Sequence, residues 1–255
     1  MTHKFLSIIS LLTRIPIKLS HEPDYSSSAL FFPLTGLLLS IVIFLPALLF
    51  SLIIRTPLLL TFIILISQYL TANLFHLDGL MDTADASGVF GSKEKRYEVL
   101  KDSRIGVYGF FAGTAILGGK FLVTYLLVSN SILDTWASYM LAMAFSRYAS
   151  ILITNFAQPV NQSGLAVQLG KPSVFNATIS VIACSLLPLI LFMRNGNILA
   201  ASISFFLTGV SAVLTAGYLS TWYAKNIGGY NGDAMGAVIE LTELFSLIGT
   251  CIVFN

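Results

Sequence analysis

Long apolar runs, each about the length of a membrane-crossing helix, dominate the pattern along the chain. About 20 mostly apolar residues cross the hydrocarbon core as a helix, and only helices or closed barrels satisfy the backbone within lipid. The runs are continuous and lack the alternation of barrel strands, so helices are expected. They lie at Leu30–Ile54, Pro57–Phe75, Val107–Ser129, Asp134–Thr154, Ser173–Met193, Ile198–Tyr223 and Met235–Phe254.

This pattern predicts an all-α integral membrane protein with about seven transmembrane helices in one bundle. No internal repeat or linker divides the chain, so residues 1–255 are expected to form a single polytopic membrane domain. Residues 1–29 are expected to form an N-terminal interfacial segment, because Arg14 interrupts the apolar stretch and no small-residue cleavage site follows. Residues 76–106 form a motif region of acidic and basic residues.

Composition supports residence in the lipid bilayer. The chain is 56% hydrophobic and 10% charged, whereas soluble domains carry about 25% charged residues. The net charge of +2 and the absence of a basic patch argue against a nucleic-acid partner. The two cysteines, Cys184 and Cys251, lie in apolar runs without metal-site or disulfide spacing, which indicates buried small side chains.

Basic residues predict the orientation of the bundle, because Lys and Arg are more frequent in cytoplasmic connections. With the N-terminus in the cytoplasm, ten Lys and Arg residues lie in inside segments, and only Arg55 and Arg194 lie outside. The sequence therefore predicts a cytoplasmic N-terminus. It also predicts that the three acidic stretches described below lie at the cytoplasmic end.

The first acidic stretch reads HLDGLMDTADASGVFGS, from His76 to Ser92. On a helix, Asp78, Asp82 and Asp85 share one face. Three like charges on one face repel unless a cation lies among them, and Mg²⁺ binds through a few carboxylates and substrate phosphates. The alternative interpretation is a hydrated helix face just outside the membrane.

The second stretch places Lys101, Asp102, Ser103 and Arg104 immediately before a span that begins near Gly106. The guanidinium group matches phosphate oxygens, and the lysine supplies a point charge. A positive loop that anchors the topology is the alternative, although it accounts poorly for Asp102.

The third stretch reads GGYNGDAMGAVIELTE, from Gly228 to Glu243. A glycine-rich turn delivers Asp233 to a helix start, where it could instead merely cap the helix. Glu240 and Glu243 lie within an apolar run, so they should face the bundle interior. There they either bind a metal or pair with Lys120 or Arg147.

Acidic clusters and basic residues on one side of a membrane indicate metal-assisted transfer at a phosphate. In such a site, carboxylates hold the metal and accept a hydroxyl proton, while cations neutralise developing charge. Nothing in the sequence matches a Ser-His-Asp, Cys-His, P-loop or GxGxxG arrangement.

Five motifs together resemble the adenosylcobinamide-GDP ribazoletransferase (cobalamin synthase) family. They are LLTRIPI (Leu11–Ile17), FFPLTGLLL (Phe31–Leu39), HLDGLMDTADA, VLKDSRIGVYG and GGYNGDAMGAVIELTE, and they extend over essentially the whole chain. The resemblance implies a bacterial inner-membrane enzyme, with its active site facing the cytoplasm, that acts late in cobalamin biosynthesis and requires Mg²⁺. It implies transfer of the cobinamide phosphate of adenosylcobinamide-GDP to α-ribazole or its 5′-phosphate, with release of GMP.

Combined with this resemblance, the residues lead to a specific hypothesis for the site. Asp82 or Asp85 would accept the proton, and Lys101 and Arg104 would act on phosphate oxygens. The substrate-binding candidates are Arg14, Asp102, Ser103, Asp233 and Arg147, and the metal-ligand candidates are Asp78, Asp82, Asp85, Asp233, Glu240 and Glu243.

Three rival classes fit less well. A CDP-alcohol phosphotransferase would need Ala-Arg two residues after Asp78-Gly79, where this chain has Asp82-Thr83. A membrane prenyltransferase would need paired DxxxD-type motifs. An ion-coupled transporter would show repeated halves and midplane sites. The sequence leaves open whether the chain forms a homo-oligomer.

Overall fold

The computed structural model describes residues 2–19, 23–161, 164–194 and 196–254, and it is helical throughout these ranges apart from loops and one isolated bridge between Pro159 and Tyr230. The helices are α1 Thr2–Leu12, α2 Phe31–Ser51, α3 Pro57–Gln68, α4 Leu74–Ser87, α5 Lys93–Leu100, α6 Val107–Asn130, α7 Ile132–Phe156, α8 Leu165–Leu169, α9 Val174–Met193, α10 Ile198–Asn226 and α11 Gly232–Phe254. A short 3₁₀ turn, η1, covers Ser26–Ser28, and a π-helical turn, η2, covers Tyr69–Asn73. The expected all-α architecture is confirmed.

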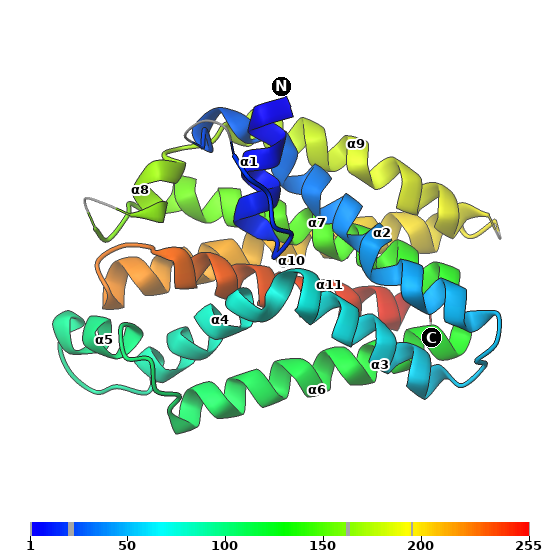
Figure 1. Cartoon of the computed structure of the whole chain (residues 1–255), viewed down its shortest axis with the longest axis horizontal. Helices are drawn as coiled ribbons and strands as arrows, with labels where there is room; N and C mark the ends of the chain where they lie inside the picture. Colours follow the sequence, from blue (N-terminus) through cyan, green and yellow to red (C-terminus); the bar gives the residue numbers. More distant parts are fainter. Residues whose placement is uncertain (1, 20–22, 162–163, 195, 255) are drawn as a thin grey trace.

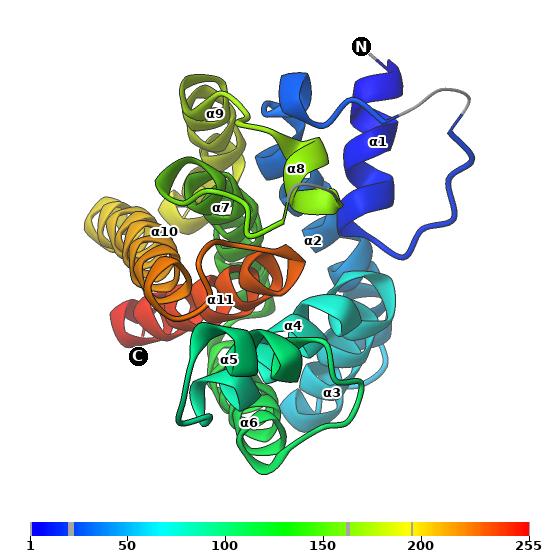
Figure 2. The same cartoon turned by 90° about the vertical axis from the view of Figure 1, so that its left-hand side faces the viewer.

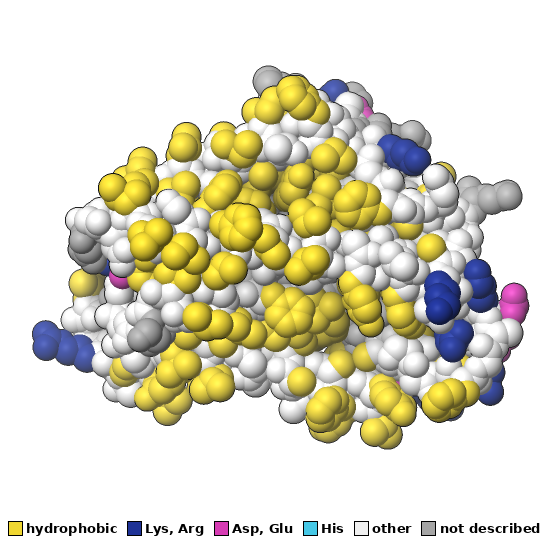
Figure 3. Space-filling view, turned by 180° about the vertical axis from the view of Figure 1, so that it is seen from behind, with side chains coloured by type: hydrophobic (Ala, Val, Ile, Leu, Met, Phe, Trp, Pro, Cys, Tyr) yellow, Lys and Arg dark blue, Asp and Glu magenta, His cyan; other side chains and the backbone are white. Residues whose placement is uncertain are grey.

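Helices α7 and α11 form the centre of the bundle, and they pack against each other. Helices α2, α9 and α10 surround α7, whereas α4 and α6 pack on the opposite side of α11 (Figures 1 and 2). On the face shown in Figure 3, apolar side chains cover much of the surface, and basic side chains gather mainly at one end. This surface suits a bundle surrounded by lipid, because hydrocarbon imposes no cost on exposed apolar groups.

Within the described ranges, five helices are long and apolar enough to cross a membrane: α2, α6, α9, α10 and α11. The bent pair α3–α4 would make a sixth if it counts as one span, so the expected number of seven is not confirmed. Helix α7 forms where expected and has 25 residues, but it is not among the apolar helices. Because protein surrounds it, α7 carries buried polar side chains, including Ser138, Ser146 and Arg147.

The run Pro57–Phe75, expected as one span, is sharply bent near its end. Helix α3 ends at Gln68, the backbone passes through η2, and α4 continues at 85° to the first segment. A π-helical turn interrupts the regular hydrogen-bond ladder and is a recognised cause of a kink. The break directs Gln68 and Tyr69 toward α11, where their side chains bond to buried carboxylates.

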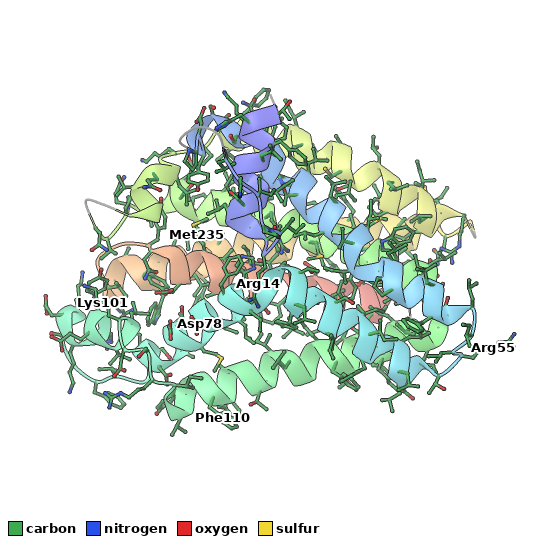
Figure 4. All side chains as sticks on the ribbon, in the orientation of Figure 1. Arg14, Arg55, Asp78, Lys101, Phe110 and Met235 are labelled. Atoms are coloured by element: carbon green, nitrogen blue, oxygen red, sulfur yellow. The ribbon has the colours of Figure 1, made fainter. Side chains whose placement is uncertain are left out.

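Basic side chains are more numerous at one end of the face shown in Figure 3. Lys101 lies at one end, close to α5, and Arg55 lies at the opposite end (Figure 4). The segment between α4 and α6 also contains the short helix α5, which begins after Ser92 and is not among the apolar runs of the sequence. The cytoplasmic location of the basic end stays a prediction.

Candidate functional site

Two glycines let α4 and α11 cross in close contact. A Cβ atom at Gly79 would lie 2.8 Å from the Cα of Asp233, and one at Gly236 would lie 3.0 Å from the Cα of His76. Any larger side chain would force the helices apart, since real Cβ contacts are not this short. The crossing therefore brings the start of α11 directly against the acidic motif of α4.

Four carboxylates gather at this crossing. Asp78, Asp82 and Asp85 lie on α4, as expected, and Asp233 lies in the first turn of α11. The charges of the other three all act on Asp82, which is half-buried, whereas Asp78 is exposed. The structure thus brings together acidic residues from two segments that are far apart in the sequence, and metal binding by them stays a prediction.

The carboxylate of Asp233 does not cap α11, because Asn231 performs that role. The Asn231 side-chain oxygen accepts a hydrogen bond from the Ala234 amide at 3.1 Å. Its amide group donates to Oδ2 of Asp233 at 2.6 Å. Sequence reasoning missed Asn231, although an Asn just before a helical run is a standard capping signal. One side chain therefore starts the helix and orients the carboxylate.

Asp85 holds the beginning of α6. Its two carboxylate oxygens accept hydrogen bonds from the backbone amides of Gly106 and Gly109, each at 2.8 Å. A side chain at either glycine would clash with this carboxylate. Both oxygens of Asp85 are therefore engaged in fixing α6 against α4.

The basic candidates lie beside Asp85. The Arg104 guanidinium bonds to Oδ2 of Asp102 at 2.6 Å and is 87% exposed. The hydrogen bonds from the side chain and backbone of Arg104 lower the pKa of Asp102 to about 2.

Lys101 lies over the ring of Tyr97, with Nζ 4.2 Å from the ring centre. Asp85, Asp102 and Arg104 line a cavity of about 380 Å³, so Asp102 orients a guanidinium at its edge. Ser103 is exposed in the same loop.

A second cavity, of about 220 Å³, lies between α1, α4 and α11. Asp78 and Asp233 line one part of it, and most of the remaining lining is apolar. Arg14 follows the end of α1, and its backbone amide bonds to the Thr71 carbonyl at 2.8 Å. Figure 4 shows Arg14, Asp78 and Met235 around the region where these helices meet. The N-terminal segment thus forms one wall of the site.

Glu240 and Glu243 belong to a separate, fully buried ion-pair cluster. Lys120 Nζ lies 2.8 Å from Glu240 and 2.6 Å from Glu243, and Arg147 also pairs with Glu243. Of the two alternatives that the sequence left open, pairing is the one found. Glu240 and Glu243 were also candidate metal ligands, and Arg147 was a candidate substrate-binding residue. In the structure these side chains pair with buried opposite charges instead, because an unpaired buried charge is strongly destabilising.

Further polar partners in the interior were not predicted from sequence. Gln68 donates to Glu243 at 2.7 Å, and Tyr69 donates to Glu240 at 2.9 Å. Thr83 of α4 and Tyr223 of α10 share a hydrogen bond of 2.7 Å. A polar residue within an apolar run signals a buried partner, but its identity depends on which helices become neighbours.

Among the described residues, no group of three or more His, Cys, Asp or Glu side chains is arranged to hold a metal ion by itself. A Mg²⁺ ion commonly binds through one or two carboxylates and takes its remaining ligands from water and substrate phosphates. The carboxylates at the crossing therefore fit a partial metal shell that a phosphate-bearing substrate would complete.

Comparisons with known proteins agree over nearly the whole chain. A family model described as cobalamin-5-phosphate synthase matches residues 4–251. Three relatives, each named adenosylcobinamide-GDP ribazoletransferase, are similar throughout. That of Thermodesulfovibrio yellowstonii is 30% identical over 97% of this chain and 95% of its own length. That of Vibrio cholerae is 32% identical over 94% and 90%, and that of Pyrococcus abyssi is 31% identical over 95% of each chain.

No solved structure matches the chain. The family match covers all three acidic stretches. Helices α4 and α11, which carry the first and third, cross in close contact, and α6, which follows the second, packs against both. The extent of that match, together with relatives at 30% identity or more over most of the chain, shows that the protein belongs to the cobalamin-5-phosphate synthase family of enzymes.

Proposed function

We propose that the protein is a Mg²⁺-dependent adenosylcobinamide-GDP ribazoletransferase of the bacterial inner membrane, with its active site facing the cytoplasm. The acceptor is α-ribazole or its 5′-phosphate. Its ribose 3′-oxygen forms a bond to the phosphorus next to cobinamide, and the bond from that phosphorus to the bridging oxygen breaks. GMP leaves with the bridging oxygen. The observation that carries the proposal is the α4–α11 crossing, which brings Asp233 against the acidic motif.

The proposed metal-binding residues are Asp78 and Asp233, which line the same cavity, and Asp82 lies near them as the proposed proton acceptor. Three neighbouring carboxylates repel one another near an apolar bundle, and a divalent cation relieves this repulsion. When bound, Mg²⁺ would neutralise the pyrophosphate and stabilise the charge that develops on GMP. Asn231 would support the site by orienting the Asp233 carboxylate.

The proposed phosphate-binding residues are Arg104, Lys101 and Arg14. Arg104 is exposed, and Asp102 holds its guanidinium at the edge of the larger cavity. A guanidinium can bond two phosphate oxygens at once. Arg14 is exposed just beyond the end of α1, whose last residues line the smaller cavity.

Asp82 is the proposed acceptor of the hydroxyl proton. It is half-buried and lies between Asp78 and Asp85 on α4, whereas each oxygen of Asp85 accepts a hydrogen bond from a backbone amide. We therefore reassign Asp85 from proton acceptor to positioning residue. We also assign Glu240, Glu243 and Arg147 to the buried cluster, outside the metal shell.

The test is release of GMP by the purified protein in liposomes. The reaction contains adenosylcobinamide-GDP, Mg²⁺ and either α-ribazole or its 5′-phosphate, and the product is identified by mass. EDTA should stop the reaction, and excess Mg²⁺ should restore it. An absence of GMP release with both acceptors, from a monodisperse preparation, would refute the proposal.

A further inference from the structure

The cavity between α1, α4 and α11, the smaller of the two described above, has the properties of a binding site for part of a substrate. Its volume of about 220 Å³ is below the roughly 300–1,000 Å³ of complete small-molecule sites. It reaches Asp78 and Asp233 at one side. The apolar lining residues are Leu11, Leu12, Phe75, Met235 and Ile239.

One buried polar side chain in this lining is unsatisfied. His76 is 2% exposed, and its Nδ1 atom has no hydrogen-bond partner within the described part of the chain. The ring packs against that of Phe75, with the ring centres 4.0 Å apart. A buried nitrogen without a partner is costly, so a ligand that supplies a partner gains affinity.

We propose that this cavity binds the aromatic base of the acceptor, an apolar two-ring azole with a single free ring nitrogen, and that His76 bonds to that nitrogen. The benzimidazole of α-ribazole has this chemistry. This proposal rests on the proposed function, since it assigns the acceptor to one wall of that site. His76 is a substrate-binding residue in this scheme.

The base of the donor fits the same cavity less well. Guanine carries polar groups along its edges, and an apolar lining with one imidazole would leave most of them unpaired. A glycosylated benzimidazole has one free ring nitrogen and so requires one polar contact, which the Nδ1 atom of His76 can supply. The separate cavity lined by Asp85, Asp102 and Arg104 remains for the GMP portion of the donor.

Gly232 offers a way to narrow the cavity without a clash between the helices. It lines the cavity, and a Cβ atom there would meet nothing within 4 Å. Gly118 on α6 provides the matched control, because a Cβ there also meets nothing within 4 Å and it lies outside the cavity. The variants are Gly232→Leu and Gly118→Leu, each checked for an unchanged unfolding temperature.

The experiment measures KM for each substrate and inhibition by free benzimidazole. Gly232→Leu should raise the acceptor KM about tenfold or more, with the donor KM unchanged, since it removes acceptor binding alone. His76→Leu should raise the acceptor KM about fivefold, which is the effect of one lost hydrogen bond. His76→Gln should raise the acceptor KM less, because the glutamine side chain can also form a hydrogen bond. Benzimidazole should compete with the acceptor, and less strongly in Gly232→Leu. Gly118→Leu should match the wild type.

Unchanged acceptor KM in Gly232→Leu, or an equal rise in donor KM, would overturn the assignment of the cavity. Equilibrium dialysis of benzimidazole alone against the purified protein separates this proposal from the proposed function. Binding that Gly232→Leu weakens would support the cavity even if no GMP were released. Binding that is equal in both proteins, or absent from the wild type, would reject it.

Discussion

Gly79 of α4 and Asp233 of α11 lie so close together that a Cβ atom at residue 79 would come within 2.8 Å of the Asp233 Cα. This contact couples two acidic motifs that are remote in sequence. The position of Asp233 relative to Asp78 and Asp82 depends on it. Helix packing and the candidate chemistry therefore share one structural cause.

Gly79→Ala should separate α4 from α11 and reduce transfer. Overpacking of this kind costs about 1–3 kcal/mol, and a shift of the carboxylates by a fraction of an ångström would lower kcat by about tenfold or more. The comparison is Gly118→Ala, where the added methyl group meets nothing within 4 Å. GMP release and the unfolding temperature are measured for both variants. Equal activity in the two would contradict the role assigned to the crossing.

Asp78→Ala and Asp82→Ala should abolish transfer while the protein stays folded in membranes. Loss of a metal ligand or of a general base lowers the rate by about 100-fold or more. Glu98→Gln serves as the control, because Glu98 lies on α5, away from the crossing. The measurement is GMP release over a range of Mg²⁺ concentrations. Near-normal turnover in both aspartate variants would end the metal-site assignment.

Arg104→Ala should raise the KM for the GDP-bearing donor about tenfold and leave the acceptor KM unchanged. The guanidinium is exposed and oriented by Asp102, so its removal deletes a charged contact to phosphate without loss of packing. Lys95→Ala, on the neighbouring helix α5, controls for the general loss of positive charge. A similar effect in both variants would indicate long-range attraction instead of direct contact.

Lys120→Met should destabilise the bundle by roughly 3–5 kcal/mol, because it leaves buried carboxylate charge uncompensated. Lys120 pairs with both Glu240 and Glu243, and all three side chains are at most 1% exposed. The double variant Lys120→Met with Glu240→Gln should recover part of this stability. Unfolding is followed by circular dichroism in detergent, with exposed Lys93 changed to Met as the control. If Lys120→Met and the Lys93→Met control unfold at the same temperature, the cluster has no structural role.

The orientation of the bundle can be tested with single cysteines at opposite ends. Lys95→Cys should be protected from a membrane-impermeant maleimide in intact cells, and Arg55→Cys should react. The native Cys184 and Cys251 are buried, so the background is low. Permeabilised cells provide the control, in which both introduced cysteines should react. The reverse pattern would place the acidic site on the outside.

Several features followed from the sequence alone. The apolar runs predicted helices because lipid leaves the backbone few alternatives. The spacing of Asp78, Asp82 and Asp85 placed them on one face of α4, since helical geometry is local. The five motifs identified the family, which the match over residues 4–251 confirms.

Only the tertiary structure decided how these elements serve the site. The run Pro57–Phe75 bends at η2. Glu240 and Glu243 pair with Lys120, and Glu243 also pairs with Arg147. The carboxylate of Asp85 accepts hydrogen bonds from two backbone amides at the start of α6. Each outcome depends on which side chains become neighbours across the bundle. A buried carboxylate can bind a metal, a lysine or an amide, and its own segment does not specify which partner the folded chain will supply.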